Sequence, residues 1–316
     1  MDVRNSVIEA ENRIRAHIRE TPVEESIWLS ELSGGEVYLK LENLQITNSF
    51  KLRGAANKLL SLSDDEQSRG IVTASTGNHG SAIAYLLRKF GWPGTIYVPE
   101  TASKAKVSAL EQYGANLKFH GQDGIETENF ARRFAEEKGM TYVSPYNDEE
   151  IIGGQGTIGL ELERQLGQID AVVVPIGGGG LAAGVAGYLK AVYRSIEIIG
   201  CQPVNSKVMY ESLAAGKILD LPSEPTLADG TAGGIEIDSL TFPICQATID
   251  EMVLIEEEEI VDSIRQVLER HHLLIEGAAA LSVAALLKNF ERFDGKKVVL
   301  VLSGARLSLD VLREIL

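Results

Sequence analysis

Residues 169–184 read IDAVVVPIGGGGLAAG, and this stretch decides the fold that the chain can adopt. Ala171 to Val174 are an apolar run that predicts a buried strand. Gly177 to Gly180 follow as a loop, and the small and apolar residues from Leu181 onward predict a helix. The backbone N–H groups of such a loop converge on an anion at the positive end of the helix dipole. The stretch therefore predicts an α/β protein with a phosphate-binding turn.

The glycine loop also allows a nucleotide-binding interpretation. No lysine follows the glycines as a Walker loop requires, which argues against a nucleoside triphosphate. Gly177, Gly179 and Ala182 match the loose dinucleotide pattern, with Glu197 roughly twenty residues further on. Glu197 begins the next predicted strand, whereas a ribose-binding acid belongs at a carboxyl end, where the chain has Gln202. A nicotinamide-dependent dehydrogenase remains an alternative that depends on the glycine pattern alone.

Strand-like and helical stretches alternate along the whole chain. Strands are expected at residues 36–41, 70–73, 94–98, 116–119, 141–143, 171–174, 197–201, 252–255 and 297–302. This alternation indicates an α/β protein with mainly parallel sheets and helices on both faces. We expect residues 68–147 to form a small substrate-loop domain inserted in a large cofactor-binding domain, residues 1–67 and 148–316. The site would then lie between the domains.

Composition and charge restrict the partners of the chain. It has 316 residues and a formal net charge of −15, which disfavours nucleic acid and acidic membranes. Residues 1–20 are charged throughout and predict an amphipathic helix rather than a targeting segment. Cys201 and Cys245 are far apart and lack metal-ligand spacing. We therefore expect a cytoplasmic protein with free thiols, no nucleic-acid partner and no membrane partner.

Lys51 is the best candidate for a covalent catalyst. It lies within SFKLRGA, residues 49–55, at the start of a predicted helix. An amine becomes a nucleophile when burial or a neighbouring cation lowers its pKa, and Phe50, Leu52 and Arg53 can supply both effects. An ordinary solvated lysine is the alternative, so the assignment depends on the rest of the chain.

A second turn carries polar groups between a predicted strand and a predicted helix. Residues 71–75 read as a short strand, residues 76–80 as the tight turn TGNHG, and residues 81–90 as a helix. A turn rich in N–H groups and hydroxyls at a helix start suits a substrate carboxylate. Asn78 can form a hydrogen bond to a ring hydroxyl, and His79 can contribute its backbone alone.

Five motifs stand in the order found in the threonine dehydratase and serine racemase family of pyridoxal-phosphate enzymes, which have fold type II. They are SFKLRG at 49–54, STGNHG at 75–80, GGQGT at 153–157, GGGGL at 177–181 and LSG at 302–304. The resemblance runs essentially end to end. It implies that the cofactor is pyridoxal 5'-phosphate and that Lys51 carries it as an imine.

The resemblance also implies the other contacts with the cofactor. Phe50 would pack beside the ring, Asn78 would bond the ring hydroxyl, and Ser303 would face the pyridine nitrogen. Glu276 interrupts an apolar helix start, and the family places a comparable glutamate near the cofactor; helix capping is the alternative. The phosphate would lie on the glycine loop, formed by Gly177, Gly178, Gly179, Gly180 and Leu181.

The substrate contacts follow from the same resemblance. The turn residues Ser75, Thr76, Gly77, Asn78 and His79 would bind the substrate carboxylate. Thr76 stands where racemases of the family usually have a serine opposite the lysine, and it keeps the hydroxyl. Gly230 lies in a loop that looks like the family's loop beside the ring, although turn chemistry alone would explain its glycines.

The resemblance therefore implies an ammonia-lyase that converts L-threonine-like or L-serine-like β-hydroxy amino acids to a 2-oxo acid and ammonia. It also implies a homodimer. Racemisation of serine is one alternative, and a catalytically silent, cofactor-binding scaffold is another. Thr127 replaces an arginine found near a second carboxylate in some racemases, which disfavours an acidic substrate. Ala305 and Arg306 replace the usual Gly-Asn, which indicates substrate variation, and a hydroxy amino acid such as one from hydroxyectoine breakdown stays open.

We expect no metal site. Comparable enzymes place a glutamate and, about six residues later, an aspartate after the strand that follows the glycine loop. This chain has Gln202 and Val208 at those positions. Two carboxylates are therefore missing from a site that a hard cation would need.

Overall fold

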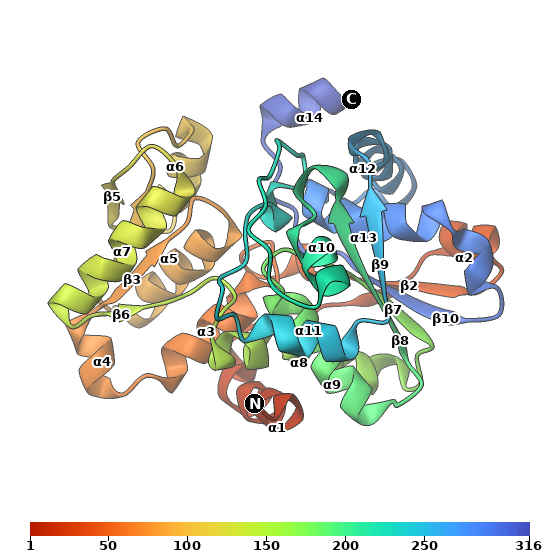
Figure 1. Ribbon diagram of the computed structural model, residues 1–316, viewed down its shortest axis with the longest axis horizontal. Helices are drawn as coiled ribbons and strands as arrows, with labels where there is room; N and C mark the ends of the chain where they lie inside the picture. Colours follow the sequence, from red (N-terminus) through yellow and green to blue (C-terminus); the bar gives the residue numbers. More distant parts are fainter.

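The computed structural model describes residues 1–316, which form two separate sheets covered by helices (Figure 1). The larger sheet has six strands in the order β1-β2-β10-β7-β8-β9. Only the β1–β2 pair is antiparallel. The strands are β1 (Val23–Glu25), β2 (Glu36–Lys40), β7 (Ala171–Pro175), β8 (Glu197–Pro203), β9 (Glu251–Ile255) and β10 (Lys297–Val301).

The smaller sheet has four strands in the order β5-β4-β3-β6, and all its pairs are parallel. Its strands come from one continuous segment of the chain and lie on the left in Figure 1. They are β3 (Ile71–Ala74), β4 (Gly94–Val98), β5 (Leu117–Phe119) and β6 (Thr141–Tyr142).

The central strands β7, β8 and β10 of the larger sheet are almost continuously apolar, so both faces of the sheet are buried there. One face packs against α2 (Ile27–Ser33), α12 (Glu257–His271), α13 (Gly277–Lys288) and α14 (Leu309–Ile315). The other face packs against α1 (Val3–Ile14), α8 (Glu149–Leu166), α9 (Gly180–Val192), α10 (Val208–Ala215) and α11 (Thr241–Thr248).

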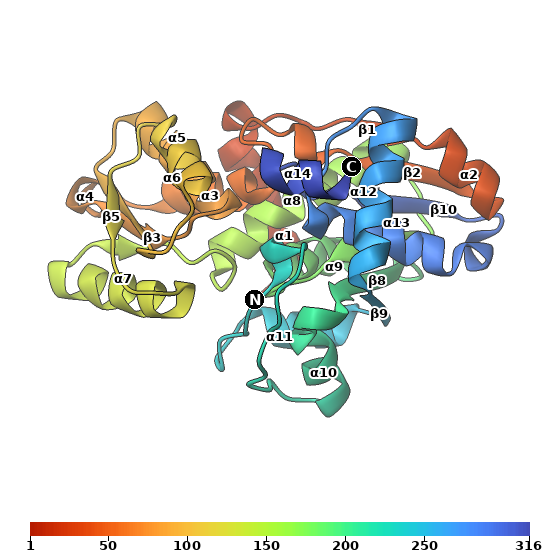
Figure 2. The ribbon, with the colours of Figure 1, turned by 90° about the horizontal axis from the view of Figure 1, so that it is seen from above.

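The smaller sheet also has helices on both faces. Helix α7 (Gly124–Lys138) covers one face through Ala131 and Ala135. The opposite face packs against α3 (Lys51–Ser61), α5 (Asn78–Phe90) and α6 (Lys104–Glu111), and α4 (Asp64–Arg69) precedes β3. Figure 2 shows α7 and the α5–α6 pair on opposite sides of these strands.

Helix α3 lies between the two sheets and carries Lys51 as its first residue. Its buried side chains join the apolar core of the smaller sheet, and Gly54 meets α8, which covers the larger sheet. A Cβ atom on Gly154 would come within 2.6 Å of the Gly54 Cα atom, so this approach requires glycine. The contact fixes Lys51 relative to both sheets.

The structure contains all nine predicted strands, with shifts at their ends, and confirms the α/β class. Strand β1 was not predicted because it has three residues and lies antiparallel at an edge. The helix predicted from residue 81 begins earlier, at Asn78. Three of the five residues of the predicted turn 76–80 are therefore helical. None of the helices combines the length and apolar character that crossing a bilayer requires.

Candidate active site

Most of the predicted site residues lie after the carboxyl ends of β3, β7 and β10 and in the first turns of α3, α5 and α9. The exceptions are Glu276, which precedes α13, and Gly230, which lies in the short 3-10 helix Asp229–Thr231. Ser49 pairs with Gly304 in an isolated bridge, and the Phe50 N–H donates to the Ser303 carbonyl over 3.1 Å. These contacts place Lys51 beside the segment that follows β10. The site is therefore assembled from parts of the chain that are distant in sequence.

Lys51 has the environment of a reactive amine. Its Nζ atom donates a hydrogen bond of 2.8 Å to the Pro145 carbonyl and lies 5.2 Å from the centroid of the Phe50 ring. Burial lowers the pKa of Lys51 to about 8, although the charge of Glu276 opposes this shift. A substantial fraction of the amine is therefore uncharged near neutral pH, as a nucleophile or a base requires.

Arg53 does not activate Lys51, so this part of the sequence prediction is wrong. Its guanidinium donates to Glu42 over 2.7 and 2.8 Å and to Glu161 over 2.7 and 2.8 Å. Lys40 donates to the same Glu161 over 2.6 Å, and all four side chains are fully buried. The two carboxylates compensate both cations locally. The cluster anchors α3 to β2 and α8 instead of changing the charge at Lys51.

Asn78 and Glu276 connect the two sheets. The Asn78 Nδ2 atom donates to both carboxylate oxygens of Glu276, over 2.8 and 3.0 Å, and the Arg306 N–H donates to Glu276 over 2.8 Å. Glu276 precedes α13, but its side chain makes no capping hydrogen bond, so the capping alternative is wrong. Burial raises the pKa of Glu276 to about 7, and the hydrogen bond from Asn78 opposes the shift.

Of the 11 buried side-chain N and O atoms that have no hydrogen-bond partner in the protein, two belong to predicted site residues. They are Oδ1 of Asn78 and Oγ of Ser303, and Ser303 is 2% exposed. Buried polar groups are rarely left without a partner, and such groups call for a ligand or an ordered water. Both atoms belong to residues for which the sequence predicts contact with a ring.

The glycine loop presents free donors. The N–H groups of Gly177, Gly178 and Gly179 donate to no acceptor in the protein. The first N–H groups of α9 point out of the N-terminal end of that helix, where this loop lies. Gly179 has φ +89°, a left-handed conformation that favours glycine. Thr241 stabilises the loop, because its Oγ1 atom donates a hydrogen bond of 2.6 Å to the Gly178 carbonyl. Leu181 is buried in the core.

Tyr146 covers the glycine loop, and sequence reasoning missed it. A Cβ atom on Gly178 would lie 2.6 Å from the Tyr146 ring, and one on Gly180 would lie 3.0 Å from the Tyr146 Cβ atom. The Tyr146 hydroxyl accepts a hydrogen bond of 2.9 Å from the Glu236 N–H. No local pattern in the sequence marks Tyr146, because it comes near the site only through the fold, which also brings the carbonyl of the preceding Pro145 to Lys51.

The predicted substrate turn is half-buried, and its donors are only partly used. Gly77 N–H donates to the Ser75 hydroxyl over 3.2 Å, whereas the Thr76 N–H has no acceptor in the protein. The His79 ring points away from the turn, because its Nε2 atom lies 3.2 Å from the Val143 carbonyl. Burial, followed by the charge of Lys51, lowers the pKa of His79 to about 3, so this imidazole is neutral. His79 can serve the turn only through its backbone.

The other residues that the sequence analysis singles out lie at different distances from the hydrogen-bonded group of Asn78, Glu276 and Arg306. Gly230 lies beside it, since a Cβ atom there would be 3.6 Å from a Glu276 oxygen. Thr127 lies in α7, where its hydroxyl donates to the His120 and Asp123 carbonyls. The Gln202 side-chain oxygen accepts from the Tyr210 N–H over 2.7 Å. The absence of a metal site stays a prediction.

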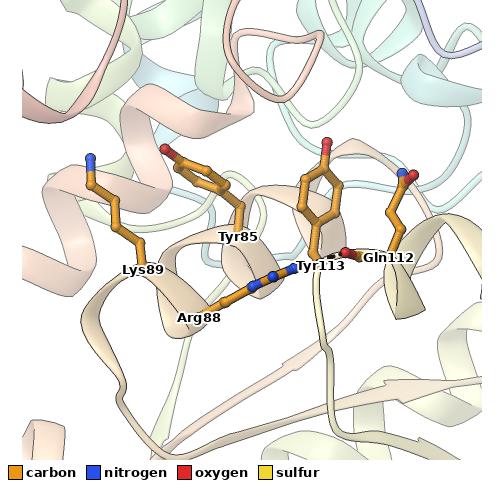
Figure 3. A pocket seen from close by; sticks show the side chains of 5 residues that line it. All are labelled: Tyr85, Arg88, Lys89, Gln112 and Tyr113. Atoms are coloured by element: carbon orange, nitrogen blue, oxygen red, sulfur yellow. Dashed lines mark hydrogen bonds between the residues drawn. The ribbon is translucent and has the colours of Figure 1, made fainter.

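A separate cavity of about 530 Å³ lies along α5 and contains none of the predicted site residues. Five side chains line it, and those of Tyr85, Lys89 and Tyr113 point to the same side (Figure 3). The Tyr85 and Tyr113 rings meet edge to face at 6.1 Å. This cavity is therefore not part of the candidate active site, which is identified by the hydrogen bonds and packing of its own residues.

A lysine amine whose pKa is lowered by burial, a glycine loop with unused N–H groups and a buried hydroxyl without a partner are groups that suit a cofactor with an aldehyde, a phosphate and a polar ring atom. The chain belongs to the family of pyridoxal-phosphate-dependent enzymes, whose model matches residues 14–304. The resemblance inferred from the five motifs is thus confirmed.

Similar proteins cover nearly the whole chain. The L-threonine ammonia-lyase of Thermotoga maritima is 41% identical over 308 residues, which are 98% of this chain and 76% of that protein. The catabolic L-threonine dehydratase TdcB of Staphylococcus aureus is 40% identical over 305 residues, 95% of this chain and 88% of that protein. Maize serine racemase superimposes with a TM-score of 0.93 and 34% identity, covering 98% of this chain and 95% of that one.

The residues present fit pyridoxal phosphate. The N–H groups of Gly177 to Gly179 can take the phosphate, and side chains at these positions would collide with Thr231, Tyr146 and Thr241. The unpartnered hydroxyl of Ser303 and the amide of Asn78 can bind polar atoms of the ring.

Proposed function

We propose that this chain is an ammonia-lyase that dehydrates L-threonine-like or L-serine-like β-hydroxy amino acids to a 2-oxo acid and ammonia. The observation that carries the proposal is Lys51, an amine with a pKa of about 8 that lies beside Glu276 and the Pro145 carbonyl. The similarity to an L-threonine ammonia-lyase and a catabolic L-threonine dehydratase supports this choice of reaction.

Each residue of the site has a role in the proposal. Pyridoxal phosphate, when bound, supplies the electron sink that makes the substrate α-proton acidic. The Lys51 amine holds the cofactor and then acts as the general base that removes this proton. The substrate loses its α-proton and its β-hydroxyl as one water, and hydrolysis of the released enamine by one water then gives the 2-oxo acid and ammonia, so the overall reaction needs no added oxidant or reductant. The half-buried turn from Ser75 to His79 holds the carboxylate through its N–H groups.

The ring contacts complete this assignment. When the cofactor is bound, Phe50 would pack beside the ring, Asn78 would bind the ring hydroxyl, and Ser303 would face the pyridine nitrogen. The loop from Gly177 to Leu181 holds the phosphate, and Glu276 orients Asn78 through the two hydrogen bonds between them. The orphaned oxygen of Asn78 and the orphaned hydroxyl of Ser303 support both ring contacts.

Racemisation is the second candidate function. The overall similarity to maize serine racemase favours it, as does the hydroxyl of Thr76 in the substrate turn. In this reaction Lys51 removes the α-proton and Thr76 returns a proton to the opposite face. The two reactions share the site, so both products must be measured from the same substrate.

The test compares Lys51→Ala with Lys58→Ala, a matched change in the same helix α3. Lys58 forms an ion pair with Asp148 over 2.6 Å and lies outside the site. Lys51→Ala should abolish the cofactor's covalent attachment, read as a visible band lost on borohydride reduction, and nearly all ammonia release from L-threonine and L-serine. Lys58→Ala should keep both. Ammonia release at the wild-type rate by Lys51→Ala would end the proposal.

The same measurements separate the remaining alternatives. A dehydrogenase would show no such band in its purified form. A catalytically silent scaffold would bind the cofactor and release no ammonia from any hydroxy amino acid, including those related to hydroxyectoine.

We also propose the domain division and the setting of the enzyme. Residues 68–147 would act as the substrate-loop domain, and residues 1–67 with 148–316 as the cofactor-binding domain. The position of the four-stranded sheet within the first segment supports this division. A cytoplasmic homodimer is the proposed form, and the free, buried Cys201 and Cys245 agree with a reducing compartment. Light scattering of the purified protein tests the dimer.

A further inference from the structure

Arg306 reaches from the segment after β10 to the substrate turn of the other sheet. Its Nη1 atom donates to the Gly77 carbonyl over 2.6 Å and also to the Ser81 hydroxyl. Gly77 is the residue before α5, and its carbonyl also accepts the first hydrogen bond of that helix, from Ser81 N–H over 3.1 Å. The guanidinium therefore holds the turn at the point where α5 begins.

The main chain of Arg306 holds the same turn from its other side. The Arg306 N–H donates to Glu276, which accepts both hydrogen bonds from Asn78. Arg306 thus holds Gly77 directly through its side chain. It holds Asn78 indirectly, because both residues donate hydrogen bonds to the Glu276 carboxylate. No other residue makes hydrogen bonds to both Gly77 and the partner of Asn78.

The charge of Arg306 is unfavourable for α5 itself. The N-terminus of a helix carries a partial positive charge, so a cation there is repelled by the helix dipole. Burial also lowers the pKa of Arg306 from its usual value, although the charges of Tyr113, Glu276 and Asp229 oppose the shift. Helix stability therefore does not explain this cation. A carboxylate bound in the turn would reduce this repulsion, because it adds negative charge directly at the start of α5.

We propose that Arg306 is a positioning residue for the substrate carboxylate, since it holds the Gly77–Asn78 turn in place and adds positive potential to it. This inference rests on the proposed function, in which that turn binds the carboxylate. The asparagine usual at this position in the family is neutral and shorter. At Arg306 the site of this chain therefore differs from the usual site of the family.

The first experiment compares Arg306→Asn, Arg306→Lys and the control Arg313→Asn in the cofactor-loaded enzyme. Arg313 is an exposed residue of α14 that pairs only with Asp310. Arg306→Asn should raise the KM for L-serine and L-threonine about tenfold and change kcat less than about threefold, since uniform binding is lost. Arg306→Lys keeps the charge and should recover part of the KM effect. Arg313→Asn should behave as the wild type.

The second experiment measures backbone hydrogen exchange in residues 76–84 of the same proteins without substrate. Arg306→Asn should speed exchange in this segment and leave the affinity for pyridoxal phosphate unchanged. An unchanged KM in Arg306→Asn, with wild-type activity present, would overturn the inference and leave the proposed function intact. If the wild type released no ammonia while exchange rose in Arg306→Asn, the proposed function would fail and the holding of the turn would stand. If Arg306→Asn does not fold, Arg306→Gln takes its place, and an unchanged KM together with unchanged exchange in residues 76–84 of that variant overturns the inference.

Discussion

Replacing Glu276 by glutamine should change how stability depends on pH. The pKa of Glu276 is raised from 4.5 to about 7 in the folded protein, chiefly by burial. A group with a raised pKa stabilises the fold below its unfolded pKa, and that stabilisation is lost as pH rises through the folded pKa. Ionisation of Glu276 between about pH 5 and pH 8 should therefore lower the free energy of unfolding of the wild type by about 2.5 kcal/mol.

Glu276→Gln removes this titration but also weakens the hydrogen bonds from Asn78 and Arg306, at a cost of about 1 to 3 kcal/mol. The variant should therefore be less stable than the wild type near pH 5 and approach or exceed it near pH 8. Urea unfolding of the cofactor-free proteins at several pH values measures the difference, with Glu258→Gln as an exposed control. A difference between Glu276→Gln and wild type that stays constant from pH 5 to pH 8 would refute the reasoning.

Two further predictions concern the cofactor contacts. Gly178→Val should weaken the affinity for pyridoxal phosphate, because a Cβ atom there meets the Tyr146 ring at 2.6 Å; an unchanged affinity in a cofactor titration would mean that the phosphate binds elsewhere. Ser303→Asp should lower the ratio of elimination to racemisation, because a carboxylate would keep the ring nitrogen protonated where the buried hydroxyl of Ser303 does not. Pyruvate and D-serine measured from L-serine in one reaction give this ratio, and an equal or higher share of elimination would contradict the expectation.

The sequence predicts the strands, the glycine loop and the reactive lysine because each has a local pattern. An apolar run, consecutive glycines and a lysine at a helix start are all visible within a few residues. The connection between Asn78 and Glu276 has no such pattern, since two residues from different sheets meet only in the folded chain. The family resemblance indicated Glu276, whereas its own surroundings suggested a helix cap.

Arg53 shows why electrostatics is hard to predict from neighbours in sequence. It stands two positions from Lys51, yet its charge is compensated by Glu42, 11 residues away, and by Glu161, 108 residues away. Tyr146 was missed for a similar reason, because only the fold brings its ring over Gly178. Local sequence identifies groups that can react, and long-range contacts decide how each one is perturbed.

The order of strands in the larger sheet has a consequence for synthesis on the ribosome. The antiparallel pair of β1 and β2 joins this sheet only through β10, which follows all the other strands in sequence. The segment before Lys51 is likewise fastened by Gly304. The four-stranded sheet is continuous in sequence and can form early, whereas the site is completed only after the C-terminal strand has left the exit tunnel. A nascent chain stalled before β10 should therefore be unable to capture its cofactor.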